Sequence, residues 1–140
     1  MTINDSLKQL DKLNLPKEQY VIVGSGALGA RDIRESHDLD VLVTEELWQT
    51  LRLTYELTKI KPVENIDIGD VQILGHGSMF RNQDIASVEK IIETADIIFG
   101  HKFINLDLLK KFKKREGREK DLNDIKLIDK YLNDNNIKAI

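Results

Sequence analysis

The sequence predicts an α/β (α+β) fold in which helices cover a mixed β-sheet and two helices close the chain. Short β-branched and aromatic runs alternate with amphipathic segments in the first half, and short antiparallel pieces follow. The 140 residues are the size of one domain, and no repeat or low-complexity linker divides them. We therefore expect residues 1–140 to form a single domain.

The composition excludes several classes of protein. Hydrophobic residues make up 41% of the chain and charged residues 32%, which is too apolar for a disordered chain. The net charge of −3 argues against a protein that binds polyanions with its whole surface. The absence of cysteine excludes a disulfide framework, a thiolate zinc site and a cysteine nucleophile. No apolar run approaches the roughly 18 residues of a membrane helix and no secretory signal is seen, so we expect a cytoplasmic protein.

The first half of the chain predicts two strands and three helices. Leucines at helical spacing, Leu7, Leu10 and Leu13, predict a helix that ends before Pro16. Thr44 is a hydroxyl cap followed by two acids, so a further helix is expected to begin there. The elements expected in order are a helix over 3–14, a strand over 20–23, a short helix over 27–33, a strand over 39–43, and a helix from 44 with an apolar face of Leu47, Trp48, Leu51 and Leu57.

The second half predicts shorter strands and the two closing helices. Residues 63–74 alternate around Gly69-Asp70, which fits two strands joined by a tight turn, with one bulged strand as the alternative. Apolar residues from Ile85 to Ala95 recur at helical spacing. The elements expected here are strands within 63–74, a helix over 85–95, extended pieces at 97–99 and 103–104, and helices over 106–114 and 119–132 separated at Gly117.

A glycine-rich segment follows the first expected strand and has two interpretations. Residues 24–29 read G-x-G-x-x-G, the fingerprint of a dinucleotide-binding turn, and Glu45 lies where an acid would hold a ribose hydroxyl. Against this, residues 30–37 contain one large apolar side chain and cover a parallel sheet poorly. Asp38 and Asp40 also begin the next strand, where a dinucleotide-binding fold needs apolar residues. A small Rossmann-like dinucleotide-binding protein is the weaker alternative.

The two aspartates of the second strand support the other interpretation. Asp38 and Asp40 are two residues apart, so on a strand their side chains point to the same face. Two carboxylates held that close repel each other unless a cation or a proton lies between them. Mg²⁺ is often held by one or two carboxylates together with substrate phosphates. A metal site is therefore one interpretation, and a solvated strand edge is the alternative.

These residues resemble a known superfamily. Gly24-Ser25, twelve residues, and Asp38-x-Asp40 followed by Val-Leu-Val resemble the signature of the polymerase-β-like nucleotidyltransferases. Residues 117–125 are similar to the closing motif of small bacterial nucleotidyltransferase-like proteins, including minimal and abortive-infection-type toxins. The resemblance spans roughly residues 20–132, which is nearly the whole chain. It implies a nucleotidyltransferase-like sheet and, from those toxins, a toxin–antitoxin context.

The resemblance implies a catalytic site. Gly24 and Ser25 would contact the triphosphate of an NTP, and Asp38 and Asp40 would hold Mg²⁺ or Mn²⁺. The reaction would transfer a nucleoside monophosphate from the NTP to an acceptor hydroxyl. The cations that the resemblance places toward the nucleotide or behind the acids are Arg34, Arg118 and Lys120.

The third carboxylate of the family is ambiguous in this sequence. Asp67 lies in a good strand pattern and is a candidate catalytic residue and metal ligand, and Asp70, which follows shortly after it, is the other candidate for the third catalytic acid. The position where related short proteins are expected to have an acid is Gln72, an amide that cannot act as a base. A catalytically degenerate nucleotide- or partner-binding module on the same fold is therefore an alternative.

The acceptor is open: a protein side chain, a tRNA end and a small molecule such as an antibiotic are all candidates. A homodimer is one way to build the acceptor pocket, since no separate acceptor-binding domain is present.

The remaining polar residues give less specific predictions. Residues 110–120 hold seven basic and two acidic side chains, which suits a phosphate or RNA contact, but Lys110 to Arg115 are expected to form a solvated helix face. His76 and His101 are expected in loops, while His37 is a candidate base or phosphate contact. Asp121 and Asp124 share a helix face and are expected to form structural ion pairs.

Overall fold

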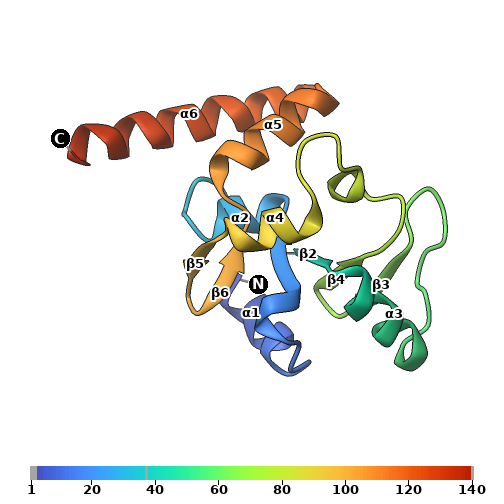
Figure 1. The fold of residues 1–140 in the computed structure, drawn as a ribbon. Coiled ribbons are helices and arrows are strands. Elements are labelled where there is room, and N and C mark those ends of the chain that lie inside the picture. Colours follow the sequence, from blue (N-terminus) through green and yellow to red (C-terminus); the bar gives the residue numbers. More distant parts are fainter. Residues whose placement is uncertain (1–2, 37, 140) are drawn as a thin grey trace.

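The computed structural model describes residues 3–36 and 38–139, and side chains as far as residue 135. It is a mixed six-stranded sheet with helices on both faces, which confirms the α+β class (Figure 1). The strands are β1 (Tyr20–Val23), β2 (Leu39–Val43), β3 (Asn65–Ile68), β4 (Val71–Leu74), β5 (Asp96–Ile98) and β6 (His101–Phe103). The helices are α1 (Ile3–Asp11), α2 (Ser25–Gly29), α3 (Glu45–Thr54), α4 (Val88–Glu93), α5 (Leu106–Glu116) and α6 (Glu119–Ala139), with short 3₁₀ turns η1 (Lys17–Gln19) and η2 (Met79–Arg81).

The strand order in the sheet is β3-β4-β2-β1-β6-β5. β1 pairs antiparallel with β2 and parallel with β6, and β2 pairs parallel with β4. The two outer pairs, β3 with β4 and β5 with β6, are antiparallel hairpins. Residues 63–74 therefore form two strands around a tight turn at Gly69, rather than one bulged strand.

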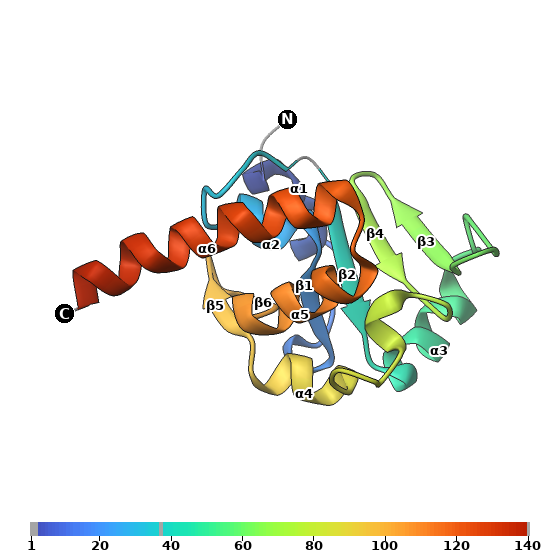
Figure 2. The same cartoon turned by 90° about the horizontal axis from the view of Figure 1, so that it is seen from above.

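The core lies on both sides of the central strands. All four residues of β1 are buried, and so are the alternate residues Leu39, Val41 and Val43 of β2. Trp48 of α3 is fully buried, as the sequence predicts. Helices α5 and α6 lie over one face of the sheet, and α1 packs behind it against β2 and β4 (Figure 2). This arrangement leaves the end of β1 and the start of β2 facing the α5–α6 pair.

Several helix boundaries differ from the sequence prediction. The helix expected over 27–33 is α2, which begins earlier at Ser25 and ends earlier, because Asp32 has a left-handed φ of 58°. The helix expected over 85–95 shortens to α4, because the side chain of Ser87 caps it by accepting a hydrogen bond from the N–H of Lys90. Leu57 lies beyond the end of α3, although it still packs against the core.

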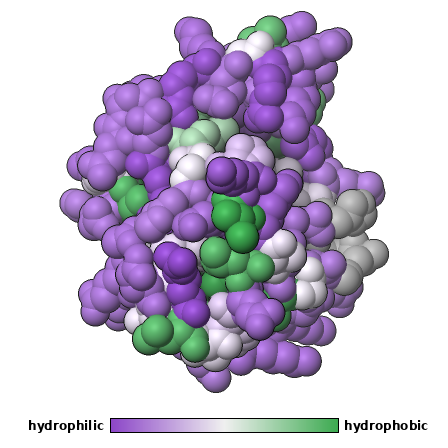
Figure 3. All heavy atoms as spheres, turned by 90° about the vertical axis from the view of Figure 1, so that its right-hand side faces the viewer, coloured by the Kyte–Doolittle hydropathy of each residue, from purple (hydrophilic) through white to green (hydrophobic). Residues whose placement is uncertain are grey.

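One face of the molecule is mainly hydrophilic (Figure 3). The face in Figure 3 is largely polar, and its apolar residues form separate small groups. Within residues 3–36 and 38–139, no helix combines the length and the apolar character needed to cross a membrane.

Candidate functional site

A cavity of about 350 Å³ lies between the sheet and the α5–α6 pair. It contains six of the residues that the sequence places at a nucleotide site, together with residues that the sequence reasoning missed. Its walls are formed by Gly24, Ser25, Arg34, Asp40, Met79, Phe80, Lys113, Arg118, Lys120, Asp121 and Asp124.

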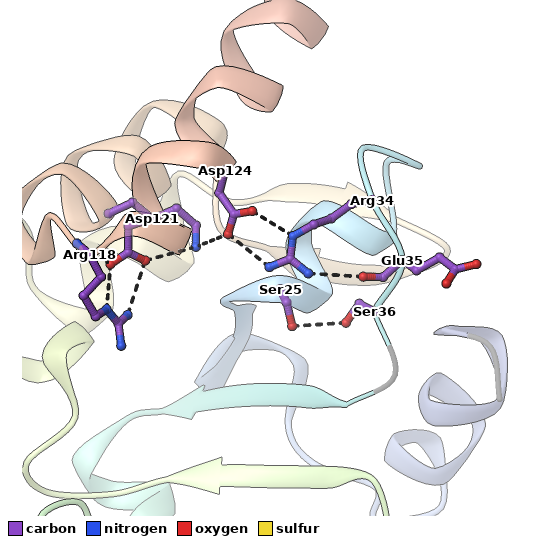
Figure 4. A network of polar contacts seen from close by, with 8 residues as sticks. Ser25, Arg34, Glu35, Ser36, Arg118, Asp121 and Asp124 are labelled. Carbon is purple, nitrogen blue, oxygen red and sulfur yellow. Dashed lines mark hydrogen bonds and ion pairs between the residues drawn. The ribbon is translucent and has the colours of Figure 1, made fainter.

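The turn after β1 forms one wall of the cavity. Gly24 has φ 67° and ψ −146°, a backbone conformation that only glycine adopts readily. A Cβ at this position would lie 2.7 Å from Oδ2 of Asp40, so the turn also needs glycine for space. The hydroxyl of Ser25 is 3.2 Å from that of Ser36 (Figure 4). The hydroxyl of Ser36 donates to the carbonyl oxygen of Asp38. The glycine turn is thus tied to the segment that carries the two aspartates.

Asp40 is half-buried at the floor of the cavity. Burial, together with the negative charges of Asp38 and Asp67, raises the pKa of its carboxyl from 3.8 to about 6. Lys113 and Lys120 act in the opposite direction. Among the described residues, neither Asp38 nor Asp40 has a hydrogen-bond or ion-pair partner for its carboxylate. Asp40 lines the cavity, whereas Asp38 is exposed and does not line it, although its charge acts on Asp40.

A row of polar residues crosses the sheet at Asp40. Asp40 is the register partner of Gln72 on β4, and Gln72 is the register partner of Asp67 on β3. Register partners point to the same face of a sheet, so Gln72 stands between the two carboxylates. Neighbouring strands are about 4.8 Å apart, which puts the backbones of Asp40 and Asp67 on the order of 10 Å apart. Asp67 is exposed, accepts a hydrogen bond from Asn65, and lies outside the cavity.

Asp70 lies in the β3–β4 turn and does not line the cavity. Its carboxylate accepts a 2.9 Å hydrogen bond from the side-chain amide of Gln9 on α1, and its N–H donates to the same amide. Asp70 therefore joins the turn to α1, and the structure gives no support to a catalytic role for it.

The opposite wall holds a network of ion pairs (Figure 4). Arg34 donates two hydrogen bonds, of 2.8 and 3.0 Å, to the carboxylate of Asp124, and Lys113 donates one of 2.9 Å to the same group. Asp121 accepts from Arg118 at 2.7 Å and lies 3.8 Å from the ammonium of Lys113. The expectation that the two aspartates form structural pairs is confirmed, and both also face the cavity.

The acids of this network are held in their charged forms. Burial raises the pKa of Asp124, but the hydrogen bonds from Arg34 and Lys113 outweigh it and keep the pKa below its usual value. The same balance applies to Asp121, where Arg118 supplies the opposing hydrogen bonds. A carboxylate whose pKa is lowered by cationic partners is a poor acceptor for a proton from a substrate. Asp121 and Asp124 thus serve to hold the cations in place.

Lys113 corrects the prediction of a solvated face over Lys110 to Arg115. It is buried, although its neighbours Lys111 and Lys114 are exposed. Its spacing gives the signal that was missed, because Lys113 lies four residues after the fully buried Leu109 on the same helix face. A lysine on the apolar face of an amphipathic helix needs buried partners, and here they are Asp121 and Asp124.

The two described histidines, His76 and His101, do not line the cavity. His101 is expected in a loop, but it is a buried residue of β6. Its ring can be buried there because Nδ1 forms a 2.7 Å hydrogen bond with the hydroxyl of Tyr20 and Nε2 pairs with Asp11 at 2.9 Å. His76 does lie in a loop, between Glu45 and Glu64. His37 falls outside the described residues.

The aspartates suit a hard divalent cation. Among the described residues, the carboxylates of Asp38 and Asp40 have no direct hydrogen-bond or ion-pair partner, and their mutual repulsion would be relieved by a bound cation. Within the part of the chain that the structure describes, no group of three or more His, Cys, Asp or Glu residues could enclose a metal. The residues therefore fit a Mg²⁺ that takes its other ligands from water and from a bound phosphate, rather than one held by protein alone.

No family model, curated protein or solved structure matches this chain.

Proposed function

We propose that this chain is a small Mg²⁺-dependent nucleotidyltransferase, which transfers a nucleoside monophosphate from an NTP to an acceptor hydroxyl. One observation carries the proposal: the cavity brings the Gly24-Ser25 turn and the carboxylate of Asp40 together beneath the cations of α5 and α6. These groups come from separate parts of the chain, and together they have the donors and the charge that a metal-bound triphosphate needs.

The charges of the cavity support an anionic ligand. Four cations and three acids line it, and Asp121 and Asp124 already neutralise part of the positive charge. Lys120 has no ion-pair partner among the described residues, and the side chain of Arg118 is half exposed at the rim. Lys120 is thus available to contact phosphate oxygens, Arg118 has one guanidinium nitrogen that is not bonded to Asp121, and Lys113 lines the inner wall.

The turn after β1 would bind the phosphates closely. A phosphate oxygen could accept from the backbone N–H groups that follow Gly24, and the hydroxyl of Ser25 could donate as well. Asp38 and Asp40 would hold the metal. When bound, Mg²⁺ would supply charge neutralisation for the triphosphate and acidify the acceptor hydroxyl.

Calorimetric titration of the four NTPs, with and without Mg²⁺, tests the proposal. We expect one nucleotide to bind only when Mg²⁺ is present, and the double variant Asp38→Asn/Asp40→Asn to lose that binding. Asp70→Asn is the matched control, because it removes a nearby acid outside the cavity and should leave the affinity unchanged. Failure of all four NTPs to bind with Mg²⁺ present would overturn the proposal.

A second candidate is a binding module that holds a nucleotide or a protein partner without turning over. Gln72 favours it, because an amide occupies the row between Asp40 and Asp67 and is a weaker metal ligand than a carboxylate. Pyrophosphate release in the presence of candidate acceptors separates the two. If NTP binds and no pyrophosphate is released, the chain is a degenerate enzyme or a binding module. In a degenerate enzyme that lacks only the acid at position 72, Gln72→Glu should restore pyrophosphate release.

The remaining expectations belong to this proposal. They are a cytoplasmic location, a toxin–antitoxin context, and an acceptor that is a protein, a tRNA end or a small molecule.

A further inference from the structure

The two edges of the sheet are protected differently. At the β3 edge, Thr58 and Lys59 lie alongside the strand, where the N–H groups of both donate to the carbonyl of Asn65. The hydroxyl of Thr58 also accepts from the N–H of Asp67. At the β5 edge, no described segment pairs with the outer side of the strand. An uncovered edge is a template for pairing with another strand.

The hairpin geometry shows which backbone groups are free at the β5 edge. Phe99 and Gly100 have φ values of 54° and 78°, as in a two-residue type I′ turn. Such a turn makes Ile98 and His101 a hydrogen-bonded pair, so the next pair, Ile97 and Lys102, is not hydrogen-bonded across the hairpin. The N–H and C=O of Ile97 therefore point outward, away from β6.

Large apolar side chains surround these free groups. Ile97 is 72% exposed and Phe99 is 63% exposed. Phe99 also adopts a left-handed backbone conformation that a bulky residue rarely takes. This conformation costs free energy, although the ring remains exposed to solvent. The acid at this edge, Asp96, is already paired with Arg31 at 2.6 Å. The edge thus presents apolar groups and little free charge.

We propose that the partner of this edge is a second copy of the chain, paired antiparallel through β5 about a two-fold axis centred on Ile97. In this register Ile97 faces the partner's Ile97 as a hydrogen-bonded pair, and Ala95 faces the partner's Phe99. Asp96 faces the partner's Ile98, so no like charges are opposed. The sequence is self-complementary in this one register, as a two-fold interface requires.

Helix α6 adds a second contact to this arrangement. Its C-terminal half extends past the β5 edge of the domain in both views (Figures 1 and 2). At about 1.5 Å per residue its 21 residues span about 31 Å, against about 16 Å for the 11 residues of α5. A two-fold axis perpendicular to the sheet puts both overhanging helices on the same face, where each extends over its partner.

A single cysteine tests the register directly, because the natural chain has none. The Cα atoms of a hydrogen-bonded antiparallel pair are about 5.5 Å apart, within the range that a disulfide spans. Ile97→Cys should form a covalent dimer rapidly under mild oxidation. Leu53→Cys is the matched control, since Leu53 is 89% exposed on α3, away from the edge, and should cross-link at least tenfold more slowly. Equal rates for the two variants would overturn the proposal.

Sedimentation equilibrium of the unmodified chain gives the second readout. We expect a mass that rises with concentration toward twice the 16.1 kDa of one chain. Ile97→Asp opposes two negative charges at the axis and should keep the protein monomeric, with an unchanged circular dichroism spectrum. Leu53→Asp should dimerise like the unmodified chain. A chain that is monomeric throughout, or an Ile97→Asp variant that still dimerises, would contradict the proposed interface.

Discussion

Gly24 and Asp40 fit together only because residue 24 has no side chain. The Cβ of any other residue at this position would lie 2.7 Å from Oδ2 of Asp40, closer than real Cβ atoms approach an oxygen. The positive φ of Gly24 puts the turn in this place, and the short strand β2 presents the carboxylate to it. The glycine of the G-S motif and the second aspartate of D-x-D are thus one structural unit, although fifteen residues separate them in sequence.

Gly24→Ala should therefore destabilise the fold and abolish NTP binding. A non-glycine residue in this backbone conformation costs about 1–3 kcal/mol, and the clash with Asp40 adds to it. Gly100→Ala is the matched control, because Gly100 also has a positive φ but has no atom within 4 Å of its Cβ position. Urea unfolding should show a larger loss for Gly24→Ala than for Gly100→Ala. Adding Asp40→Ala to Gly24→Ala should restore part of the difference, and a lack of any restoration would show that the clash is absent.

Asp40→Asn should stabilise the protein in the absence of metal. The folded-state pKa of Asp40 is raised to about 6 from 3.8, so above pH 6 the folded state holds a charge that it disfavours. The unfolded state has no such penalty, and removal of the charge should gain about 1–2 kcal/mol for a half-buried group at pH 8.

Thermal unfolding in EDTA at pH 8 and at pH 4 measures this effect. At pH 4 the carboxyl of folded Asp40 is protonated, so the gain from Asp40→Asn should shrink toward zero. An equal gain at both pH values would mean that the amide stabilises the fold for another reason. A loss at pH 8 would mean that Asp40 has a stabilising partner in the folded state.

Asp124→Asn should be strongly destabilising. It removes the charge that pairs with the buried Lys113 and leaves only one acceptor oxygen for the two hydrogen bonds from Arg34, and breaking a buried pair in this way costs roughly 3–5 kcal/mol. Asp129→Asn is the control, because Asp129 pairs with Lys110 on the exposed side of the same two helices and should cost less than about 1 kcal/mol. Chemical denaturation compares the two variants, and similar losses for both would contradict a special role for the buried network.

The sequence was sufficient to place the central strands. β1 and β2 begin and end at the predicted residues, because β1 is an uninterrupted apolar run, β2 is apolar apart from Asp40, and both have clear breaks on either side. The Gly-Ser turn and the D-x-D strand were also predicted, and the cavity brings Gly24, Ser25 and Asp40 together. Local patterns of this kind depend on neighbours in the chain, so one sequence reveals them.

The contacts that complete the site could not be predicted in the same way. Arg34 and Asp124 are 90 residues apart, and nothing local to either residue indicates the other. The histidine of β6 was misplaced for the same reason, since its partner Tyr20 is 81 residues away. Lys113 is the exception, because its position on the apolar face of α5 was visible in the spacing. Long-range polar pairs depend on how the helices pack, which the sequence pattern does not record.

The burial of His101 predicts a pH dependence of stability, although the pairing with Asp11 acts on its pKa in the opposite direction. Burial lowers the pKa of His101 below 6.5, and the nearby positive charge of Lys17 adds to the effect, so the folded state binds a proton less readily than the unfolded state. Stability should therefore fall as the pH drops through the unfolded-state value of about 6.5. The thermal midpoint measured between pH 8 and pH 5 should fall less steeply for His101→Gln than for the unmodified chain. Because Asp40 has the opposite dependence, the comparison uses the difference between the two proteins at each pH. A difference that stays constant from pH 8 to pH 5 would show that His101 binds a proton equally well in the folded and unfolded states.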